Sequence, residues 1–334
     1  MLSGHVFFPM LSFAGMAGID RILFFGTPEL AVPTLAALVE AGRSPVRVVT
    51  QPARPVGRGH RLQDPPVAVW AREHGLEVTQ PERVRAPAFL EEVAALAPDV
   101  AVVVAFGQIF PRALLDLPRH GCVNLHASLL PRWRGASPIQ AALAAGDTRT
   151  GVTTMKMDEG MDTGPILLEE SLEIGPLETA GELGKRLAET GARLMARTIG
   201  LLERGEIEPR PQPAEGVTHA PLLTRESGRV DWGLSAREIL DRLRAYTPWP
   251  GLTAELRGEP VKITAAEVID EVGAFGGTTA PGTILGLRGG RLLAVSCGGG
   301  TVLGLAELQR PGKRALRAAD FLNGERLRTG ESFT

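Results

Sequence analysis

The chain has 334 residues, which exceeds what one hydrophobic core usually supports and predicts two domains. Its 44% hydrophobic and 22% charged residues are an ordinary globular composition, and its net charge of −2 excludes a globally basic nucleic-acid binder. Its two cysteines, Cys122 and Cys297, have no CxxC spacing, so the sequence predicts two buried thiols and neither a disulfide framework nor a zinc site.

The first twenty residues contain an apolar run at 6–14 that resembles the core of a secretion signal. No Lys or Arg precedes the run, a proline interrupts it, and it is far shorter than the ~20 residues of a membrane span. We therefore expect residues 1–20 to be a dispensable leader. No other stretch is long and apolar enough to span a bilayer, so no membrane association is expected.

Short apolar runs alternate with helical patterns between residues 21 and 207. The expected strands are 22–25, 46–50, 76–79, 100–105 and 123–126, and the expected helices are 30–41, 67–74, 88–96 and 137–145. This alternation predicts an α/β domain, a Rossmann-like and mostly parallel sheet covered on both faces. The runs 150–157 and 166–172 extend the sheet, and 183–202 forms a long closing helix.

Three prolines within five residues interrupt every periodicity at 209–213 and predict a stiff linker over residues 208–223. Residues 224–330 then form the second domain. One helix is expected at 236–246, followed by strands at 252–256, 261–269, 282–287, 292–296 and 301–308. Glycine-rich turns between the later strands predict a small antiparallel β-barrel.

The turn after the first strand does not match a dinucleotide-binding fingerprint. It contains Gly26 where that motif needs three glycines, and Pro28 occupies the turn itself. A nicotinamide cofactor is therefore not expected.

Asn124 and His126 carry the most specific chemical signal in the chain. Side chains alternate across a strand, so residues two apart lie on the same face, here at the carboxyl end of an expected parallel strand. Ligands of such sheets bind beyond that end. An amide and an imidazole aimed at one point predict an enzyme that donates hydrogen bonds to a reacting atom.

Four further segments occur with this pair in a fixed order: 21–29 (RILFFGTPE), 51–59 (QPARPVGRG), 131–140 (PRWRGASPIQ) and 246–250 (YTPWP). Together they resemble the family that uses 10-formyltetrahydrofolate as a formyl donor, from about Arg21 to the C-terminus. Within it, the likeness is to members that formylate methionine on initiator tRNA. The resemblance implies an OB-like barrel in the second domain, Asn124, His126 and Asp162 as catalytic residues, a folate co-substrate, and no metal.

The residue types suit that chemistry. Formyl transfer to an amine passes through a tetrahedral species with a negatively charged oxygen, and each fixed donor at that oxygen lowers the barrier by ~3 to 4 kcal/mol. Asn124 can donate its amide, and His126 can donate as an imidazolium or relay a proton. Asp162 beside His126 would favour the protonated ring. The alternatives are a hydrogen-bonded strand-end histidine and a turn-forming aspartate between two glycines.

A folate needs a flat, mostly apolar slot with backbone hydrogen-bonding groups at its edge. The residues expected to line it follow two strands, and they are Phe106, Gly107, Ile109, Ser128, Leu129, Leu130 and Pro131, with Asp158 from a nearby loop. Relatives often carry Tyr at the position of Phe106. Each of these residues is equally typical of ordinary core and turns.

Basic residues are the expected tRNA contacts. Arg54, Arg58 and Arg61 lie in a loop whose Pro and Gly content predicts no regular element and which resembles the tRNA-contacting insertion of the family. Arg58 is the expected decisive contact. Residues 224–334 carry 15 Lys or Arg against 13 Asp or Glu, and their candidate phosphate contacts are Lys262, Lys313, Arg314 and Arg317.

Three alternative functions fit parts of this pattern. A 10-formyltetrahydrofolate hydrolase shares the architecture but would have no evident use for the arginine loop. A sugar or purine-precursor N-formyltransferase would use the same catalytic residues. A non-catalytic folate-sensing or RNA-binding protein would not need them. The expected protein is a cytoplasmic monomer that acts on initiator methionyl-tRNA.

Overall fold

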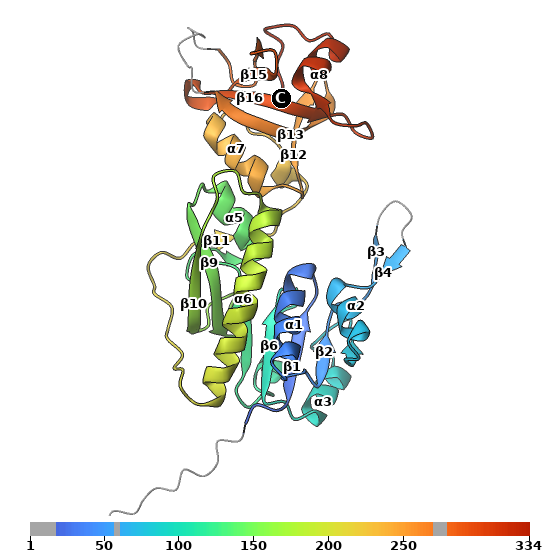
Figure 1. Ribbon diagram of the computed structural model, residues 1–334, viewed down its shortest axis with the longest axis vertical. Helices are drawn as coiled ribbons and strands as arrows, with labels where there is room; N and C mark the ends of the chain where they lie inside the picture. Colours follow the sequence, from blue (N-terminus) through green and yellow to red (C-terminus); the bar gives the residue numbers. More distant parts are fainter. Residues whose placement is uncertain (1–17, 57–60, 270–278) are drawn as a thin grey trace, which may run out of the picture. The chain divides into compact units, whose positions relative to one another are not determined.

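The computed structural model describes residues 18–56, 61–269 and 279–334 (Figure 1). They form two compact units, one of residues 18–123 and 195–210 and one of residues 124–194 and 211–334. Most of the expected leader, residues 1–17, lies outside the described residues. So do residues 57–60 and 270–278.

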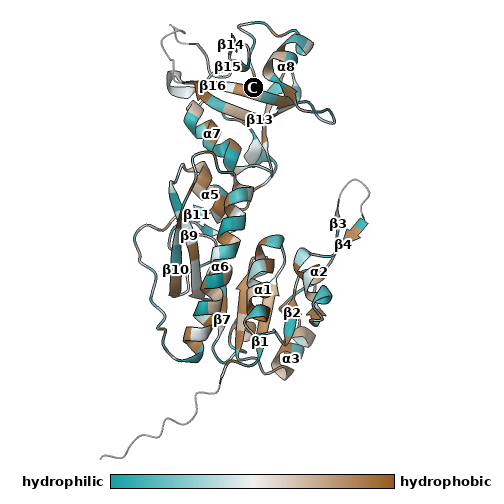
Figure 2. Ribbon diagram, viewed as in Figure 1, coloured by the Kyte–Doolittle hydropathy of each residue, from teal (hydrophilic) through white to brown (hydrophobic). Residues whose placement is uncertain are grey.

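The first unit is built on a parallel sheet with the strand order β6-β1-β2-β5. Its strands are β1 (Ile22–Gly26), β2 (Arg47–Val49), β5 (Val78–Thr79) and β6 (Val100–Val104). Every residue of β1 and β6 is buried, and β1 is brown in the hydropathy colouring of Figure 2. Burial on both faces is the reason parallel strands appear as continuous apolar runs, and all four expected strands are confirmed.

The predicted helices of this unit are confirmed within a few residues. They are α1 (Val32–Glu40), preceded by a 3₁₀ turn at Glu29–Ala31, α2 (Pro66–Glu73) and α3 (Pro87–Ala95). Each has a proline in its first turn, where the missing N–H has no intrahelical partner to lose. A further four-residue helix, α4 (Arg112–Leu115), was not predicted because one turn is too short to show periodicity.

The arginine loop contains a regular element, and the prediction that it has none is wrong. Strands β3 (Arg54–Val56) and β4 (Arg61–Gln63) pair as an antiparallel ribbon in which Pro55 lies opposite Leu62. Both strands of an isolated ribbon are edge strands, and an edge tolerates the missing N–H of a proline.

The second unit begins within β7 (Cys122–His126) and continues through α5 (Pro138–Ala144). Strands β9 (Arg149–Lys156) and β10 (Ile166–Glu173) pair as antiparallel neighbours, and α6 (Ala180–Glu203) follows them. These five predicted elements are confirmed. Although α6 has 24 residues, no helix in the described ranges has both the length and the apolarity needed to cross a bilayer.

A short parallel ladder was not predicted. Strand β8 (Arg134–Gly135) pairs with β11 (His219–Ala220), a segment of the expected linker. Gly135 has φ of +121°, and a Cβ there would lie 2.5 Å from the Ala220 carbonyl oxygen. Only glycine fits this approach without strain.

The C-terminal part of the second unit is an antiparallel sheet, as predicted, with the order β12-β13-β16-β15-β14 and β17 beside β16. Its elements are α7 (Ala236–Ala245), β12 (Leu252–Leu256), β13 (Glu259–Ile269), β14 (Ile284–Arg288), β15 (Leu292–Ser296), β16 (Val302–Gln309), β17 (Leu316–Arg317) and α8 (Ala318–Glu325). In the described part of the chain no pairing of β12 with β14 closes this sheet into a barrel. Glu255 instead exchanges two backbone hydrogen bonds with Thr334, and Ile284 N donates to Glu331 O at 2.7 Å.

Helix α7 is tied to the preceding part of the second unit by a buried ion pair. Arg244 Nε donates to Asp241 Oδ1 at 2.9 Å, and both side chains are about 95% buried. Arg244 Nη1 also donates to the Gly175 carbonyl at 3.2 Å. Removal of Asp241 would leave the Arg244 charge buried without a carboxylate, which is strongly destabilising. Asp241 itself also accepts from Arg237 Nε at 3.2 Å.

Both cysteines are buried free thiols, in agreement with their interpretation as small apolar side chains. Burial raises the pKa of Cys122 to about 12, with a smaller contribution from Asp116, and burial raises the pKa of Cys297 to about 12. Neither thiol is therefore a nucleophile near neutral pH.

Candidate active site

Strand β7 presents Asn124 and His126 on one face, as its alternation requires. The His126 side chain is 6% exposed, whereas Asn124 is half-buried. No described residue forms a hydrogen bond with the Asn124 amide. This amide, in the middle of β7 and half-buried, is therefore available to a ligand.

The His126 ring is held between two acceptors. Its Nε2 lies 2.9 Å from the Trp133 carbonyl oxygen, which can only accept, so this nitrogen carries a proton. Its Nδ1 lies 3.6 Å from Asp162 Oδ2, beyond the range of a normal hydrogen bond. The structure therefore brings His126 and Asp162 together and leaves Nδ1 the less constrained nitrogen.

Asp162 is fixed from both its backbone and its carboxylate. Its φ of +54° lies in the left-handed region, which is uncommon for a residue with a side chain. Gly135 N donates to its Oδ2 at 2.8 Å, which aims the carboxylate toward β8 and the His126 ring. Nearby, a Cβ at Gly164 would lie 1.8 Å from Lys156 O, so the loop packs closely against the end of β9.

Asp158 orders the same loop. Its Oδ1 accepts from Gly160 N at 3.0 Å and from Thr163 Oγ1 at 2.7 Å. One carboxylate oxygen therefore serves the turn itself, and Oδ2 remains for a ligand.

The segment expected to bind folate, residues 128–131, is hydrogen-bonded to β9. Thr153 Oγ1 donates to Ser128 O at 2.7 Å and accepts from Leu130 N at 3.2 Å. Leu130 packs in a buried cluster with Met155 and Ile166. Since Ser128 and Leu130 are buried, the segment can offer a ligand the half-buried Leu129 and Pro131 and its backbone.

In the first unit, Phe106 is part of the core. It is 2% exposed, and its ring centroid lies 5.3 Å from Phe25 and 5.9 Å from Phe110. Its carbonyl accepts from Thr27 Oγ1 at 3.0 Å and Gln51 Nε2 at 2.9 Å. The aromatic face is therefore not presented to a ligand, whereas Ile109, which is 82% exposed, is accessible.

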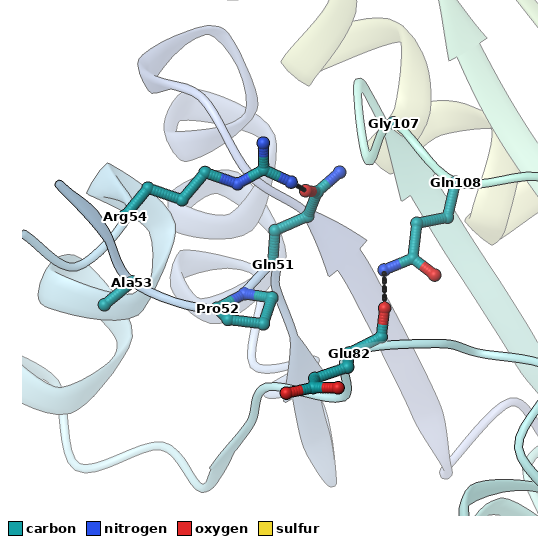
Figure 3. Close-up of a pocket in the computed structure, with 7 residues that line it drawn as sticks. All are labelled: Gln51, Pro52, Ala53, Arg54, Glu82, Gly107 and Gln108. Carbon is teal, nitrogen blue, oxygen red and sulfur yellow. Dashed lines mark hydrogen bonds between the residues drawn. The ribbon is translucent and has the colours of Figure 1, made fainter.

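A pocket of about 510 Å³ lies beside Gly107 (Figure 3). Its lining includes amides and charged groups and comes from residues that follow β2, β5 and β6: Gln51, Pro52, Ala53, Arg54, Glu82, Gly107 and Gln108. Arg54 Nη2 donates to Gln51 Oε1 at 2.7 Å, and its other N–H groups have no partner among the described residues. Gln108 lies within the segment 105–109 that was expected to line a folate slot, whereas Gln51 and Glu82 were not predicted as lining residues.

The predicted tRNA-contacting residues are partly described. Arg58 lies outside the described residues, and Arg61 is exposed in β4. Lys313, Arg314 and Arg317 are exposed, whereas Lys262 in β13 is half-buried. Lys262 lies opposite Gln309, whose Nε2 donates to Lys313 O at 2.7 Å, so both lysines lie near the same end of β16.

Sequence analysis also missed the ladder that supports the Asp162 contact. Thr218 Oγ1 accepts from Trp133 N at 2.9 Å, and Trp133 has φ of +63°. Trp133 also supplies the carbonyl oxygen to which His126 Nε2 donates. A lone threonine in a linker gives no periodic signal by which this contact could be predicted.

Comparisons with known proteins agree with this architecture. A family model described as formyl transferase matches residues 20–199, and one described as formyl transferase, C-terminal domain, matches residues 222–326. The methionyl-tRNA formyltransferase of Myxococcus xanthus is 48% identical over 93% of this chain and 96% of its own length. That of Pelobacter propionicus is 50% identical over 91% and 92%.

Solved structures share the fold at lower identity. An N-formyltransferase from Helicobacter canadensis in complex with folinic acid and dTDP-3-aminofucose has a TM-score of 0.64 at 17% identity, covering 86% of this chain and 98% of that one. HypX from Aquifex aeolicus in complex with tetrahydrofolic acid has a TM-score of 0.57 at 18% identity, covering 90% and 46%.

The close approach of β8 to β11 can be tested by Gly135→Ala, with Gly216→Ala as a matched control. Both glycines have positive φ, +121° and +78°, but a Cβ at Gly216 would meet no atom within 4 Å. The control should lose ~1 to 2 kcal/mol from the free energy of unfolding, as expected for backbone strain alone. Gly135→Ala should lose at least ~1 kcal/mol more. Equal losses in urea unfolding would show that the ladder is not a tight contact.

Proposed function

The chain belongs to the formyl transferase family, and we propose that it transfers a formyl group from 10-formyltetrahydrofolate to the α-amino group of methionine on initiator tRNA. The product, formylmethionyl-tRNA, serves translation initiation. Relatives with 46–50% identity over most of the chain are named methionyl-tRNA formyltransferase. The structural observation that carries the proposal is the Asn124 amide, which has no hydrogen-bond partner among the described residues, on the same strand as a His126 ring flanked by Asp162.

In this proposal Asn124, His126 and Asp162 are the catalytic residues. The folate co-substrate supplies an electrophilic formyl carbon. The Asn124 amide donates to the oxygen on which negative charge develops, because a donor fixed in advance costs no reorganisation during the reaction. His126 donates or relays a proton through Nδ1, the nitrogen that makes only the long 3.6 Å contact. Asp162 stabilises the positive charge on the ring.

The nucleophile needs little activation. An α-amino group has a pKa of ~7.7 to 8.0 and is partly neutral near pH 7. This explains why the site offers donors and a proton relay rather than a nucleophilic side chain.

The proposed folate contacts come from three segments of the chain. We assign Ser128, Leu129, Leu130 and Pro131 a binding role through their backbone and the half-buried Leu129 and Pro131, and Asp158 a role through its Oδ2. Phe106 contributes to binding by holding the turn that contains Gly107 and the exposed Ile109. These assignments are supported by the family resemblance and by the ordering of each segment.

We also propose the finer organisation of the chain. Residues 21–207 form the catalytic domain, 208–223 the linker and 224–330 the second domain, and family matches at 20–199 and 222–326 support these bounds. The second domain is OB-like, with residues 331–334 hydrogen-bonded both to β12 and to the start of β14 in place of direct strand pairing. The protein acts as a cytoplasmic monomer.

The function is tested with purified protein, 10-formyltetrahydrofolate and one of three acceptors: methionyl initiator tRNA, free methionine or water. Formyl groups should appear on the first acceptor alone, because the basic residues proposed to bind tRNA have no role with the other two. Formyl-methionine and released tetrahydrofolate are measured together. Tetrahydrofolate release without an amino acceptor would establish a hydrolase instead.

Two substitutions test the chemistry. Asn124→Ala and His126→Ala should each lower kcat by ~10²-fold or more, since each removes a donor used mainly in the transition state. Folate affinity, measured by equilibrium binding, should change little. His74→Ala, which removes an exposed histidine immediately after α2, is the control and should retain full activity. Near-normal turnover of His126→Ala would exclude the proposed mechanism.

Arg58 is tested by Arg58→Leu. We propose that it recognises initiator tRNA through a base-edge or end-opening contact, so the variant should lose ~1 to 3 kcal/mol of catalytic efficiency with that tRNA. A minimal aminoacyl substrate should react almost normally. Arg85→Leu, at an exposed arginine of the same unit, should behave as wild type with both substrates. Equal losses of Arg58→Leu on both substrates would remove Arg58 from tRNA recognition.

A further inference from the structure

Gln212, in the proline-rich linker, contacts the loop that carries Asp162. Its Nε2 lies 2.8 Å from the Asp162 carbonyl oxygen and 2.8 Å from the Gly164 carbonyl oxygen. Its Oε1 lies 2.6 Å from Arg134 Nη2 and 3.0 Å from Arg134 Nε. The side chain therefore joins three separate segments of the second unit.

The chemistry of the partners fixes the orientation of this amide. Carbonyl oxygens only accept and guanidinium nitrogens only donate, so the NH2 must face Asp162 and Gly164 and the oxygen must face Arg134. Both N–H groups and both lone pairs are then in use. No other amino-acid side chain of this length provides two donors on one atom and an acceptor on the other.

Gln212 is the one donor to these two carbonyl oxygens among the described residues. Asp162 has φ of +54°, a left-handed conformation that is strained for an L-residue and persists only where its surroundings enforce it. The bond from Gly135 N fixes the carboxylate, whereas Gln212 fixes the backbone on both sides of Thr163.

We propose that Gln212 is a positioning residue for formyl transfer, which acts by holding the Asp162 loop so that its carboxylate stays beside His126. The proposal rests on the proposed function. Arg134 orients Gln212, and both side chains line a pocket of about 540 Å³ together with Thr163 and Pro211. The linker is in this view part of the catalytic apparatus rather than a spacer between two domains.

The first test is Gln212→Met, which keeps the side-chain length and removes all four hydrogen bonds. A loop shifted by about 1 Å should lower kcat by ~10 to 100-fold, while KM for the folate donor and for tRNA stays within ~3-fold of wild type. Gln309→Met is the matched control, because Gln309 is a half-buried residue at the end of β16 whose side chain makes one hydrogen bond. Unchanged kcat, or a loss confined to KM, would overturn the proposal.

The second test is Gln212→Glu, which separates the two donor contacts from the contact with Arg134. The introduced carboxylate can accept from Arg134 but cannot donate to the two carbonyls. Beside the Arg134 guanidinium it stays ionised near neutral pH, so kcat should fall ~10 to 100-fold, as in Gln212→Met, although the contact with Arg134 is kept. A kcat near that of the wild-type protein would contradict the assignment.

The third test does not depend on activity. Amide hydrogen exchange in residues 158–164 should become faster in Gln212→Met, while exchange in β9 and β10 stays as slow as in wild type. Unchanged exchange at 158–164 would overturn the role of Gln212 even in an active enzyme.

Failure of the wild-type protein to formylate methionyl-tRNA, combined with faster loop exchange in the variant, would overturn the proposed function and leave the positioning role in place.

Discussion

The conformation of Asp162 is the constraint on which the candidate site depends. A carboxylate can face His126 from this loop only if its backbone adopts φ of +54°, and that backbone must be held by groups outside the loop. Gly135 N holds the carboxylate, and the ladder between β8 and β11 holds Gly135. The histidine depends on the same segment, because it donates to the carbonyl of Trp133. Removal of one of these contacts therefore weakens the others.

The residues with a left-handed backbone show how the fold places functional groups at the ends of strands. Strands β1 and β6 are fully buried and conform to ordinary backbone geometry. The chain changes direction immediately after β6, with Ala105 at φ of +46° and Gly107 at +83°. In the second unit Trp133 and Asp162 are likewise left-handed. Rigid strands thus supply the fixed frame, and short strained turns aim carbonyls and side chains beyond it.

The sequence predicts those parts of the molecule that have a local pattern. Buried strands such as β6 appear as apolar runs and helices as periodic ones, and the spacing of Asn124 and His126 predicts a shared face. The role of Asp162 came from resemblance, since an aspartate between glycines is also typical of a turn. The contacts of Gln212 and the β8–β11 ladder could not be predicted, because each joins residues about 50 to 85 positions apart through one or two side chains or backbone groups.

The linker explains why the two halves of the sequence cannot be treated as separable modules. Its prolines stiffen residues 209–213, so Gln212 is presented in a restricted conformation, and a few residues later β11 adds to β8. Beyond it, α7 is anchored through Arg244 to the Gly175 carbonyl by a buried charge that tolerates no loss of its partner. The C-terminal sheet therefore follows a segment whose backbone already forms part of the site. Displacement of this segment would remove the two hydrogen bonds that Gln212 donates to the Asp162 and Gly164 carbonyls.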